Sequence, residues 1–189
     1  MVTTSVNDLT FEEYLNYDDD EGCKYELVDG KLEIMNPPVL EHFLIAKWLE
    51  KVLDTEINRL NLDWLCLRET GVRTGKKKSR LPDLAVVNIE QAKELKNQSV
   101  VFQTPPLLII EVVSPESIKR DYRFKRSEYA ALAVPEYWVV DPIVAKISIL
   151  LLEEGLYEEQ IFTDNQQIIS RIFPEIIITP DRVFLAGNV

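Results

Sequence analysis

Leu107-Leu108-Ile109-Ile110-Glu111-Val112-Val113 is the stretch of the chain that decides the fold. Its apolar and largely β-branched side chains are typical of a strand that is buried on both faces of a sheet. Glu111 is the exception, because a buried carboxylate costs several kcal/mol unless a cation, hydrogen bonds or a proton compensates it. The run therefore predicts a central strand and a special use for Glu111.

A second acidic residue stands at the mouth of another short apolar run. Pro82-Asp83 directly precedes Leu84-Ala85-Val86-Val87, which reads as a strand. If the two strands are neighbours, Asp83 and Glu111 come close together. Two carboxylates placed in this way are the usual ligands of a hard divalent cation, so the pattern predicts a metal site.

Length and composition indicate an ordinary folded protein. The 189 residues, of which 46% are hydrophobic and 28% charged, fit one domain with a sizeable core. No apolar stretch approaches the roughly 20 residues that span a bilayer, and Met1 to Tyr14 has no signal-peptide pattern, so we expect a cytoplasmic protein. Cys23 and Cys66 lie far apart, which favours reduced thiols over a disulfide or zinc site.

The charge is unevenly distributed along the chain. A net charge of −11 argues against general binding to nucleic acid, yet residues 73–80 and 119–126 together hold ten of the 21 basic residues and one acid, Asp121. Positive charge is thus concentrated beside Asp83 and Glu111. A solvated loop and a solvated helix face would give the same pattern. The candidates for contact with nucleic acid are Arg73, Lys76, Lys77, Lys78, Arg80, Lys119, Arg120 and Arg123.

Periodicity and turn signals predict an α/β or α+β architecture. Asp29-Gly30 between two short alternating runs predicts a type I′ hairpin. Thr10 is a candidate cap for the first helix. We expect a basic loop between the third and fourth strands, and a mixed tail after residue 168. The predicted helices cover residues 11–17, 39–60 and 118–133, and the predicted strands cover 25–28, 31–35, 64–73, 81–87, 107–113, 136–141, 145–152 and 156–162.

The helix predicted over residues 118–133 contains a lysine on its apolar stripe. Ile118, Tyr122, Lys125, Tyr129 and Leu132 are separated by four, three, four and three residues, so they share one face. Lys125 is the one cation on the face that should point inward. Either its ammonium reaches Glu111, or the side chain extends along the surface to solvent.

Several motifs in order resemble the Uma2 family, which by resemblance belongs to the PD-(D/E)XK nuclease-like superfamily. The motifs are Pro82-Asp83, Glu111-Val112-Val113, the basic helix ending in Tyr129, and Val134-Pro135-Glu136-Tyr137-Trp138-Val139-Val140-Asp141. The likeness extends back to the hairpin at residues 25–30. It implies a restriction-endonuclease-like core, a mixed sheet of about four strands flanked by helices. We expect a single domain over residues 1–189, with an N-terminal helix and hairpin extension (1–37), a core (about 38–162) and a C-terminal extension (163–189).

The resemblance also implies site residues and a cofactor. Asp83 and Glu111 would bind Mg²⁺ or Mn²⁺, with the backbone carbonyl of Val112 as a further ligand. The superfamily pattern places a lysine two residues after the glutamate, where this chain has Val113. In some branches the lysine comes from the following helix, and Lys125 is the residue here that would act with Asp83 and Glu111 in catalysis.

Five other residues are candidates for the same pocket. His42, the only histidine, begins the long helix next to Glu41 and is either a ligand or proton carrier at the rim, or a hydrogen-bonded boundary residue. Glu26 in the hairpin either approaches the metal, pairs with Lys31 across the hairpin, or faces solvent. The full set of these candidates is His42, Glu26, Glu41, Asp121 and Tyr129.

These observations favour a metal-dependent endonuclease that hydrolyses phosphodiester bonds in DNA. A divalent cation lowers the pKa of a bound water and neutralises charge on the transition state, which two carboxylates and a lysine would support. The alternative is a non-catalytic nuclease-fold protein that binds nucleic acid or a protein partner. Hydrolysis of a smaller phosphate ester is a third possibility, and a homodimer is a reasonable assembly.

Overall fold

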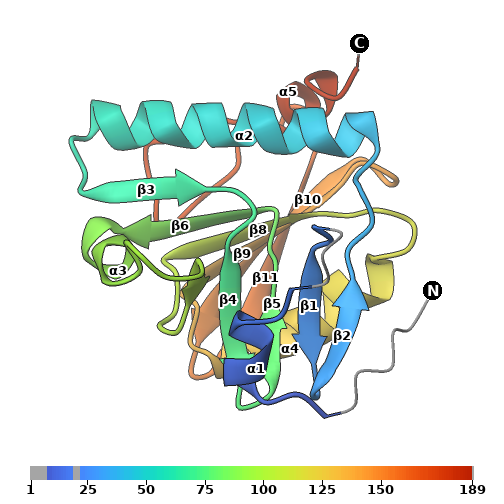
Figure 1. The fold of residues 1–189 in the computed structure, drawn as a ribbon. Coiled ribbons are helices and arrows are strands. Elements are labelled where there is room, and N and C mark those ends of the chain that lie inside the picture. The colour runs from blue at the N-terminus through green and yellow to red at the C-terminus, as the bar shows by residue number, and fades with distance from the viewer. Residues whose placement is uncertain (1–7, 19–21, 189) are drawn as a thin grey trace.

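The computed structural model describes residues 8–18 and 22–188, which form two mixed sheets with helices around them (Figure 1). In spatial order, the first sheet contains β2 (Lys31–Ile34), β1 (Tyr25–Val28), β5 (Lys78–Arg80), β4 (Gly71–Gly75) and β7 (Val101–Phe102). The second contains β11 (Leu156–Thr163), β10 (Lys146–Glu153), β9 (Glu136–Asp141), β8 (Leu108–Val112), β6 (Leu84–Asn88) and β3 (Trp64–Leu67). The predicted mixed sheet flanked by helices is confirmed, although it has six strands where about four were expected.

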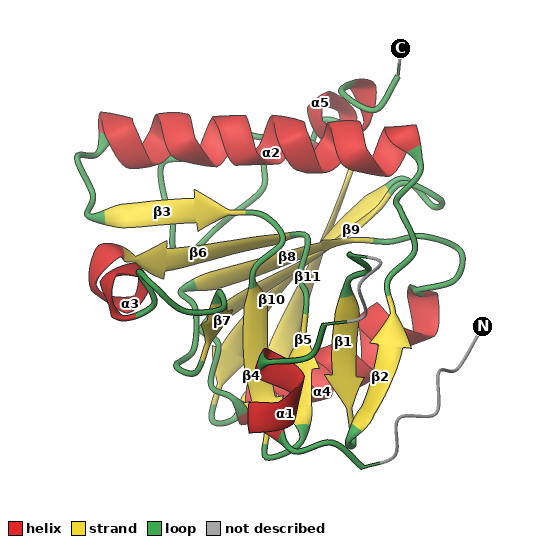
Figure 2. Cartoon of the chain, in the orientation of Figure 1, coloured by secondary structure: helices red, strands yellow, loops and turns green. Residues whose placement is uncertain are grey.

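The helices lie outside the sheets. They are α1 (Phe11–Leu15), α2 (Leu40–Arg59), α3 (Ile89–Glu94), the π-helix η1 (Arg120–Lys125), α4 (Arg126–Ala131) and α5 (Pro180–Leu185). Figure 2 shows the strands of the first sheet running at a steep angle to β3 and β6 of the second. Nowhere in residues 8–18 and 22–188 is there a helix with the length and apolarity to cross a membrane.

Strand β8 is the centre of the second sheet, as its sequence predicts. It pairs antiparallel with β6 and parallel with β9, and all five of its residues are buried. Because side chains alternate along a strand, Leu108 and Ile110 belong to the core cluster under α2, whereas Ile109 belongs to the cluster that contains Tyr129 of α4. By the same alternation Glu111 faces α4, not α2.

Helix α2 covers one face of the second sheet (Figure 1). Its residues Ile45, Leu49 and Leu53 are fully buried at a spacing of four, so they lie along one stripe of the helix. They pack in one cluster with Ile110 and Trp138 of the sheet. The helix predicted over residues 39–60 is confirmed, and it brings its first turn to the end of β8 where Asp83 lies.

The N-terminal hairpin is joined to the rest of the first sheet. Asp29 and Gly30 have φ values of 50° and 80°, as a type I′ turn requires. Thr10 caps α1, since its hydroxyl accepts a hydrogen bond from the backbone of Glu13. Strand β1 pairs with β5 through Leu27 and Ser79. The hairpin therefore lies next to β5, the strand that comes shortly before Asp83 in the chain.

Two sequence predictions about the middle of the chain are wrong. The strand expected over residues 64–73 is divided into β3 and β4, which belong to different sheets, and Glu69 between them has a φ of 60°. The expected basic loop is instead the β4–β5 hairpin, with a bulge between Arg73 and Gly75. Elements α3, β7 and α5 had no clear sequence pattern because each is short.

Candidate active site

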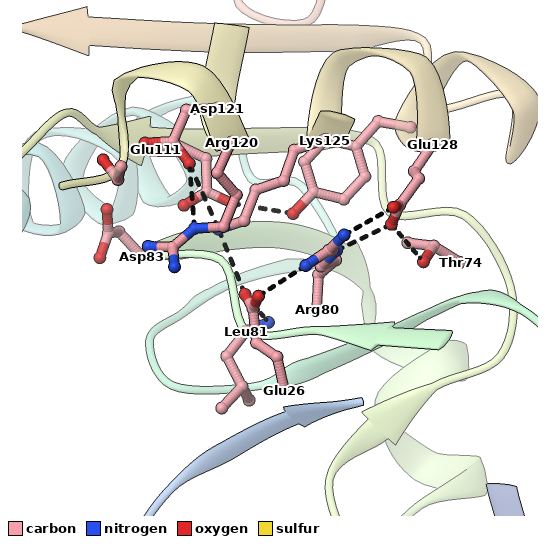
Figure 3. Close-up of polar contacts among 12 residues, drawn as sticks. Glu26, Thr74, Arg80, Leu81, Asp83, Glu111, Arg120, Asp121, Lys125 and Glu128 are labelled. Atoms are coloured by element: carbon pink, nitrogen blue, oxygen red, sulfur yellow. Dashed lines mark hydrogen bonds and ion pairs between the residues drawn. The ribbon is translucent and has the colours of Figure 1, made fainter. Parts of the chain in front are cut away.

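Asp83 and Glu111 lie on neighbouring strands, as the sequence predicts. Asp83 directly precedes β6, whose first residue Leu84 pairs with Ile110 of β8. The Oδ2 atom of Asp83 accepts a hydrogen bond of 2.7 Å from the backbone N–H of Val112. This bond fixes the Asp83 carboxylate beside the strand that carries Glu111, and Figure 3 shows both side chains on the same side of the site.

His42 holds the other oxygen of Asp83. Its Nε2 lies 2.8 Å from Oδ1 of Asp83, and its side chain is 14% exposed. The first turn of α2 therefore supplies a histidine to the rim of the site. The neighbouring Glu41 is exposed and lies beside Gly187, so the structure does not bring it to Asp83.

Lys125 reaches the carboxylates from η1. Its Nζ atom lies 2.7 Å from Oε1 of Glu111, 3.3 Å from Oε1 of Glu26 and 3.6 Å from Oδ1 of Asp121, and the side chain is 1% exposed. The hydroxyl of Tyr129 donates a 2.8 Å hydrogen bond to the same Glu111 oxygen. The alternative in which Lys125 extends to solvent is therefore wrong.

The π-helix changes which residues share the inner face. Ser117, Asp121, Lys125 and Tyr129 are all buried at a constant spacing of four, whereas Ile118 from the expected stripe is 43% exposed. A π-helix has i→i+5 hydrogen bonds and a wider turn than an α-helix, so residues four apart stay on one face. Asp121 and Lys125 are thereby presented together.

A buried ion network connects the hairpin to α4 behind the site (Figure 3). Glu26 is fully buried and accepts hydrogen bonds from Nη1 of Arg80 (2.9 Å) and from the N–H of Leu81 (3.1 Å). Arg80 also donates to both oxygens of Glu128, at 2.8 and 2.6 Å. The hydroxyl of Thr74 donates to Glu128 as well. The network holds Glu26 between two cations, Arg80 and Lys125.

These contacts correct two expectations. Glu26 does not pair with Lys31 and is not exposed, because its cross-strand neighbour is Glu33 and its side chain turns into the protein. Arg80 is 3% exposed and its donors are used by Glu26 and Glu128, so it is not offered to nucleic acid. Glu128 was not singled out in the sequence, where its signal is only an acid three residues after Lys125.

Burial dominates the electrostatics of Glu111. It raises the pKa of the Glu111 carboxyl to about 8, against the opposing effect of Lys125, while the negative charges of Asp121 and Asp83 raise it further. The four groups are therefore close enough to influence one another strongly. The direction of the shift reflects mainly the removal of the Glu111 carboxyl from water.

Glu26 is shifted in the opposite direction. Burial alone would raise the pKa of Glu26, but the nearby charges of Lys125, Arg80 and Arg120 and the hydrogen bond from Leu81 lower it to about 2. Glu26 is consequently a carboxylate over the whole neutral range. In turn, Glu111 and Glu26 outweigh the effect of burial on Lys125 and raise the pKa of its ammonium.

The carboxylate cluster, which we define as Glu26, Asp83, Glu111 and Asp121, has the chemistry to accept a further cation. Oδ1 of Asp121 is buried and, within the described part of the chain, has no hydrogen-bond partner. Burial also raises the pKa of Asp121. No group of three or more His, Cys, Asp or Glu side chains in residues 8–18 and 22–188 converges as a ready metal cage. Magnesium needs few protein ligands because it keeps several waters, so the neighbouring carboxylates of Asp83 and Glu111 fit such an ion.

The predicted basic residues are distributed between paired and exposed positions. Lys77 lies 2.7 Å from Asp8, Lys78 lies 3.3 Å from Asp29, and the guanidinium of Arg73 stacks over Phe11 at 4.0 Å. These three cations therefore already have a partner within the protein. The exposed members of the predicted set are Lys76, Lys119 and Arg123.

Two surface hollows of about 190 and 570 Å³ lie elsewhere. The smaller is next to α3, and the larger lies between α2 and residues 175–182. The lining of both hollows excludes Asp83, Glu111 and Lys125. The candidate site is thus a packed network of charges that meets solvent at Asp83 and Arg120, whose side chains are 24% and 29% exposed.

Comparison with known proteins gives the family and the fold of the chain. The model of the Uma2 family, described as "Putative restriction endonuclease", matches residues 11–181. The fold is similar to the crystal structure of "a putative nuclease belonging to DUF820" from Anabaena variabilis, with a TM-score of 0.79, 17% identity, and coverage of 95% of this chain and 99% of that one. At this identity the likeness shows the fold alone.

A second solved structure is similar over a smaller part of its length. The type IIG restriction endonuclease BpuSI matches 81% of this chain and 17% of its own, with 13% identity and a TM-score of 0.40. This likeness is too loose to carry an argument about the site. No curated protein matches the chain.

Proposed function

This chain belongs to the Uma2 family and has the fold of a nuclease-like protein, and from that premise we propose that it is a metal-dependent endonuclease that hydrolyses phosphodiester bonds in DNA. The observation that carries the proposal is the position of Lys125. Its Nζ lies 2.7 Å from Glu111, one strand away from Asp83. Two acids and a lysine from three separate elements therefore meet at one place.

Asp83 and Glu111 would hold Mg²⁺ or Mn²⁺ together with the carbonyl of Val112. The N–H and C=O of one residue in an extended strand point to the same edge, so the contact between the Val112 N–H and Asp83 directs the Val112 carbonyl toward Asp83 too. Bound there, the cation supplies a Lewis acid for the phosphoryl oxygen and lowers the pKa of an attacking water.

The side chains around the cation site have separate tasks. His42 and the N–H of Val112 each hold one oxygen of Asp83, which orients that carboxylate. Tyr129 donates to Glu111 and orients it in the same way. Lys125 has three N–H donors in a buried setting, so it is suited to orient a water or to stabilise the negative charge that develops on the phosphoryl group.

Cleavage of DNA tests the proposal. Supercoiled plasmid and branched DNA are incubated with the protein and Mg²⁺ or Mn²⁺, and with EDTA as the control. We expect metal-dependent cleavage that falls by about 10²-fold or more in Asp83→Asn, Glu111→Gln and Lys125→Met, and that is unchanged in Glu158→Gln on the exposed face of β11. Cleavage that persists in the first two variants would contradict the proposed ligands.

One observation favours the alternative of a non-catalytic nuclease-fold protein that binds nucleic acid or a protein partner. Val113 occupies the usual lysine position, is 1% exposed and packs in the cluster with Tyr129. Metal binding separates the two functions. Mg²⁺ should stabilise the native protein by about 2.7 kcal/mol at 100 times its Kd, and should not stabilise an Asp83→Ala, Glu111→Ala double variant. DNA binding without stabilisation by Mg²⁺ and without cleavage would support the alternative.

A further inference from the structure

Two arginines, Arg80 and Arg120, lie beside the carboxylate cluster, and they differ in how many of their N–H groups donate hydrogen bonds within the protein. The Nε, Nη1 and Nη2 atoms of Arg80 all donate to Glu26 or Glu128, at distances of 2.6 to 2.9 Å. The Nε atom of Arg120 is buried and has no hydrogen-bond partner among the residues that the structure describes. Its nearest carboxylate oxygen, Oδ1 of Asp121, is 3.8 Å away. Arg80 is thus saturated by the protein, whereas Arg120 retains unused donors.

Arg120 also differs from Arg80 in its access to solvent. Its side chain is 29% exposed, against 3% for Arg80. Figure 3 shows the Nε of Arg120 facing Asp121, while its terminal nitrogens extend past it on the side where Asp83 lies. The guanidinium therefore lies between the buried carboxylates and the more exposed part of the site.

The carboxylates around Arg120 stabilise its positive charge in this partly buried position. Burial disfavours its charge, but Glu26, Asp121 and Glu111 outweigh burial and raise the pKa of Arg120. An ordinary ion pair would bring the guanidinium within about 3 Å of a carboxylate, often through two parallel bonds. The 3.8 Å separation from Asp121 leaves that geometry unformed.

We propose that Arg120 binds the non-bridging oxygens of the phosphate that is cleaved, so that it is a catalytic residue and not a general contact to the DNA backbone. The inference rests on the proposed function, which supplies the phosphodiester. The four acids of the cluster repel a phosphodiester, and Arg80, which faces them, uses all three of its nitrogens on carboxylates. Among the described residues the Nε donor of Arg120 is unpaired, and its planar guanidinium has the geometry to bind two phosphoryl oxygens.

Steady-state cleavage of a duplex DNA in Mg²⁺ tests this role in Arg120→Met, Arg120→Lys and the control Arg182→Met, whose arginine is exposed on α5. We expect kcat/KM to fall about 100-fold in Arg120→Met, mainly through kcat. Arg120→Lys should recover part of the loss, since an ammonium keeps the charge without the planar fork. Urea unfolding shows whether each variant is folded. A kcat/KM for Arg120→Met within twofold of the native value would overturn the role while leaving the nuclease proposal intact.

A binding measurement separates this inference from a failure of the nuclease proposal. If the native protein cleaves no DNA, the melting temperature is followed as inorganic phosphate is added without metal. A rise in the native protein and in Arg182→Met, but not in Arg120→Met, supports the phosphate site even though the nuclease proposal fails. An equal response in native protein and Arg120→Met, including no response in either, overturns the inference.

Discussion

The Nζ atom of Lys125 lies 2.7 Å from Oε1 of Glu111, and the two side chains are 1% and 3% exposed. One partner comes from a π-helix and the other from the central strand of the sheet. A charge in such a place is tolerated only with its counter-charge, because the penalty for removing it from water is several kcal/mol. The ion pair therefore links the stability of the fold to the candidate chemistry.

Removal of the lysine should destabilise the protein. Lys125→Met leaves Glu111, Glu26 and Asp121 without their shared cation, and the free energy of unfolding should fall by about 3 to 5 kcal/mol. Urea unfolding measures the change. The double variant Lys125→Met, Glu111→Gln should lose less than the sum of the single variants, since the residue at position 111 then carries no charge that needs the lysine. Lys119→Met on the exposed surface is the control, with an expected change within about 0.5 kcal/mol. Equal stabilities for Lys125→Met and the native protein would contradict the buried pair.

Stability in acid should depend on Glu26. Its folded pKa of about 2 is below the ordinary 4.5, so the unfolded state binds more protons between these values and the contribution of Glu26 is lost as the pH falls from 4.5 to 2. The contribution is fully present above pH 4.5 and amounts to roughly 3 kcal/mol. Urea unfolding at pH 6, 4 and 2 should show that the difference between the native protein and Glu26→Gln shrinks by about this amount. A difference that does not change with pH would show that Glu26 is not held as a carboxylate by its neighbours.

Tyr129→Phe should reduce DNA cleavage strongly although it lowers the stability of the fold only slightly. The variant removes the 2.8 Å hydrogen bond to Glu111, at a cost of about 1 kcal/mol. Because the bond orients a proposed metal ligand, cleavage should fall about tenfold or more. Tyr157→Phe is the matched control, since its buried hydroxyl donates to the carbonyl of Val134 at 2.8 Å. Equal loss of cleavage in the two variants would indicate a purely structural effect.

Binding to DNA should depend on salt through the exposed cations. Lys119→Ala and Arg123→Ala should each reduce the slope of log K against log salt concentration by about 0.9, the value for one phosphate contact. Lys93→Ala on α3, whose ammonium pairs with Glu90, should leave the slope unchanged. Fluorescence anisotropy with a labelled duplex at several salt concentrations measures the slopes. An unaltered slope in both test variants would place the DNA on another surface.

Much of the site could be predicted because its signals are local. Glu111 interrupts an apolar run, Asp83 directly precedes the neighbouring strand β6, and Lys125 lies on the inner side of its helix. Alternation along β8 then settles that Glu111 faces the helix that carries Lys125. The neighbouring residues in the sequence and the periodicity of one helix were therefore sufficient to predict these three positions.

The partners of Arg80 could not be predicted, because they are distant in sequence. Glu26 and Glu128 are 54 and 48 residues away from it. In the sequence, Arg80 ends a run of basic residues that looks the same whether it is solvated or buried. Only the pairing of β1 with β5 shows that its charge is used inside the protein.

The π-helix was also hidden from the sequence. An α-helical period of 3.6 residues places Ile118 on the inner stripe, whereas the wider turn leaves it exposed and brings Asp121 inward. Similarly, the reversal at Glu69, which has a φ of 60°, divides one apparent strand into two. Both features depend on backbone geometry that the amino-acid pattern does not specify.

The candidate site depends on the N-terminal hairpin, because the hairpin supplies Glu26. Asp83, Glu111 and Lys125 all follow residue 37, so a protease that trimmed the chain there would leave these three residues in the polypeptide that remains. Arg80 and Lys125 would nevertheless lose the carboxylate of Glu26 that separates them. The positive charges of Arg80 and Lys125 would then repel each other without a carboxylate between them. Lys125 would also lose its contact with the first sheet.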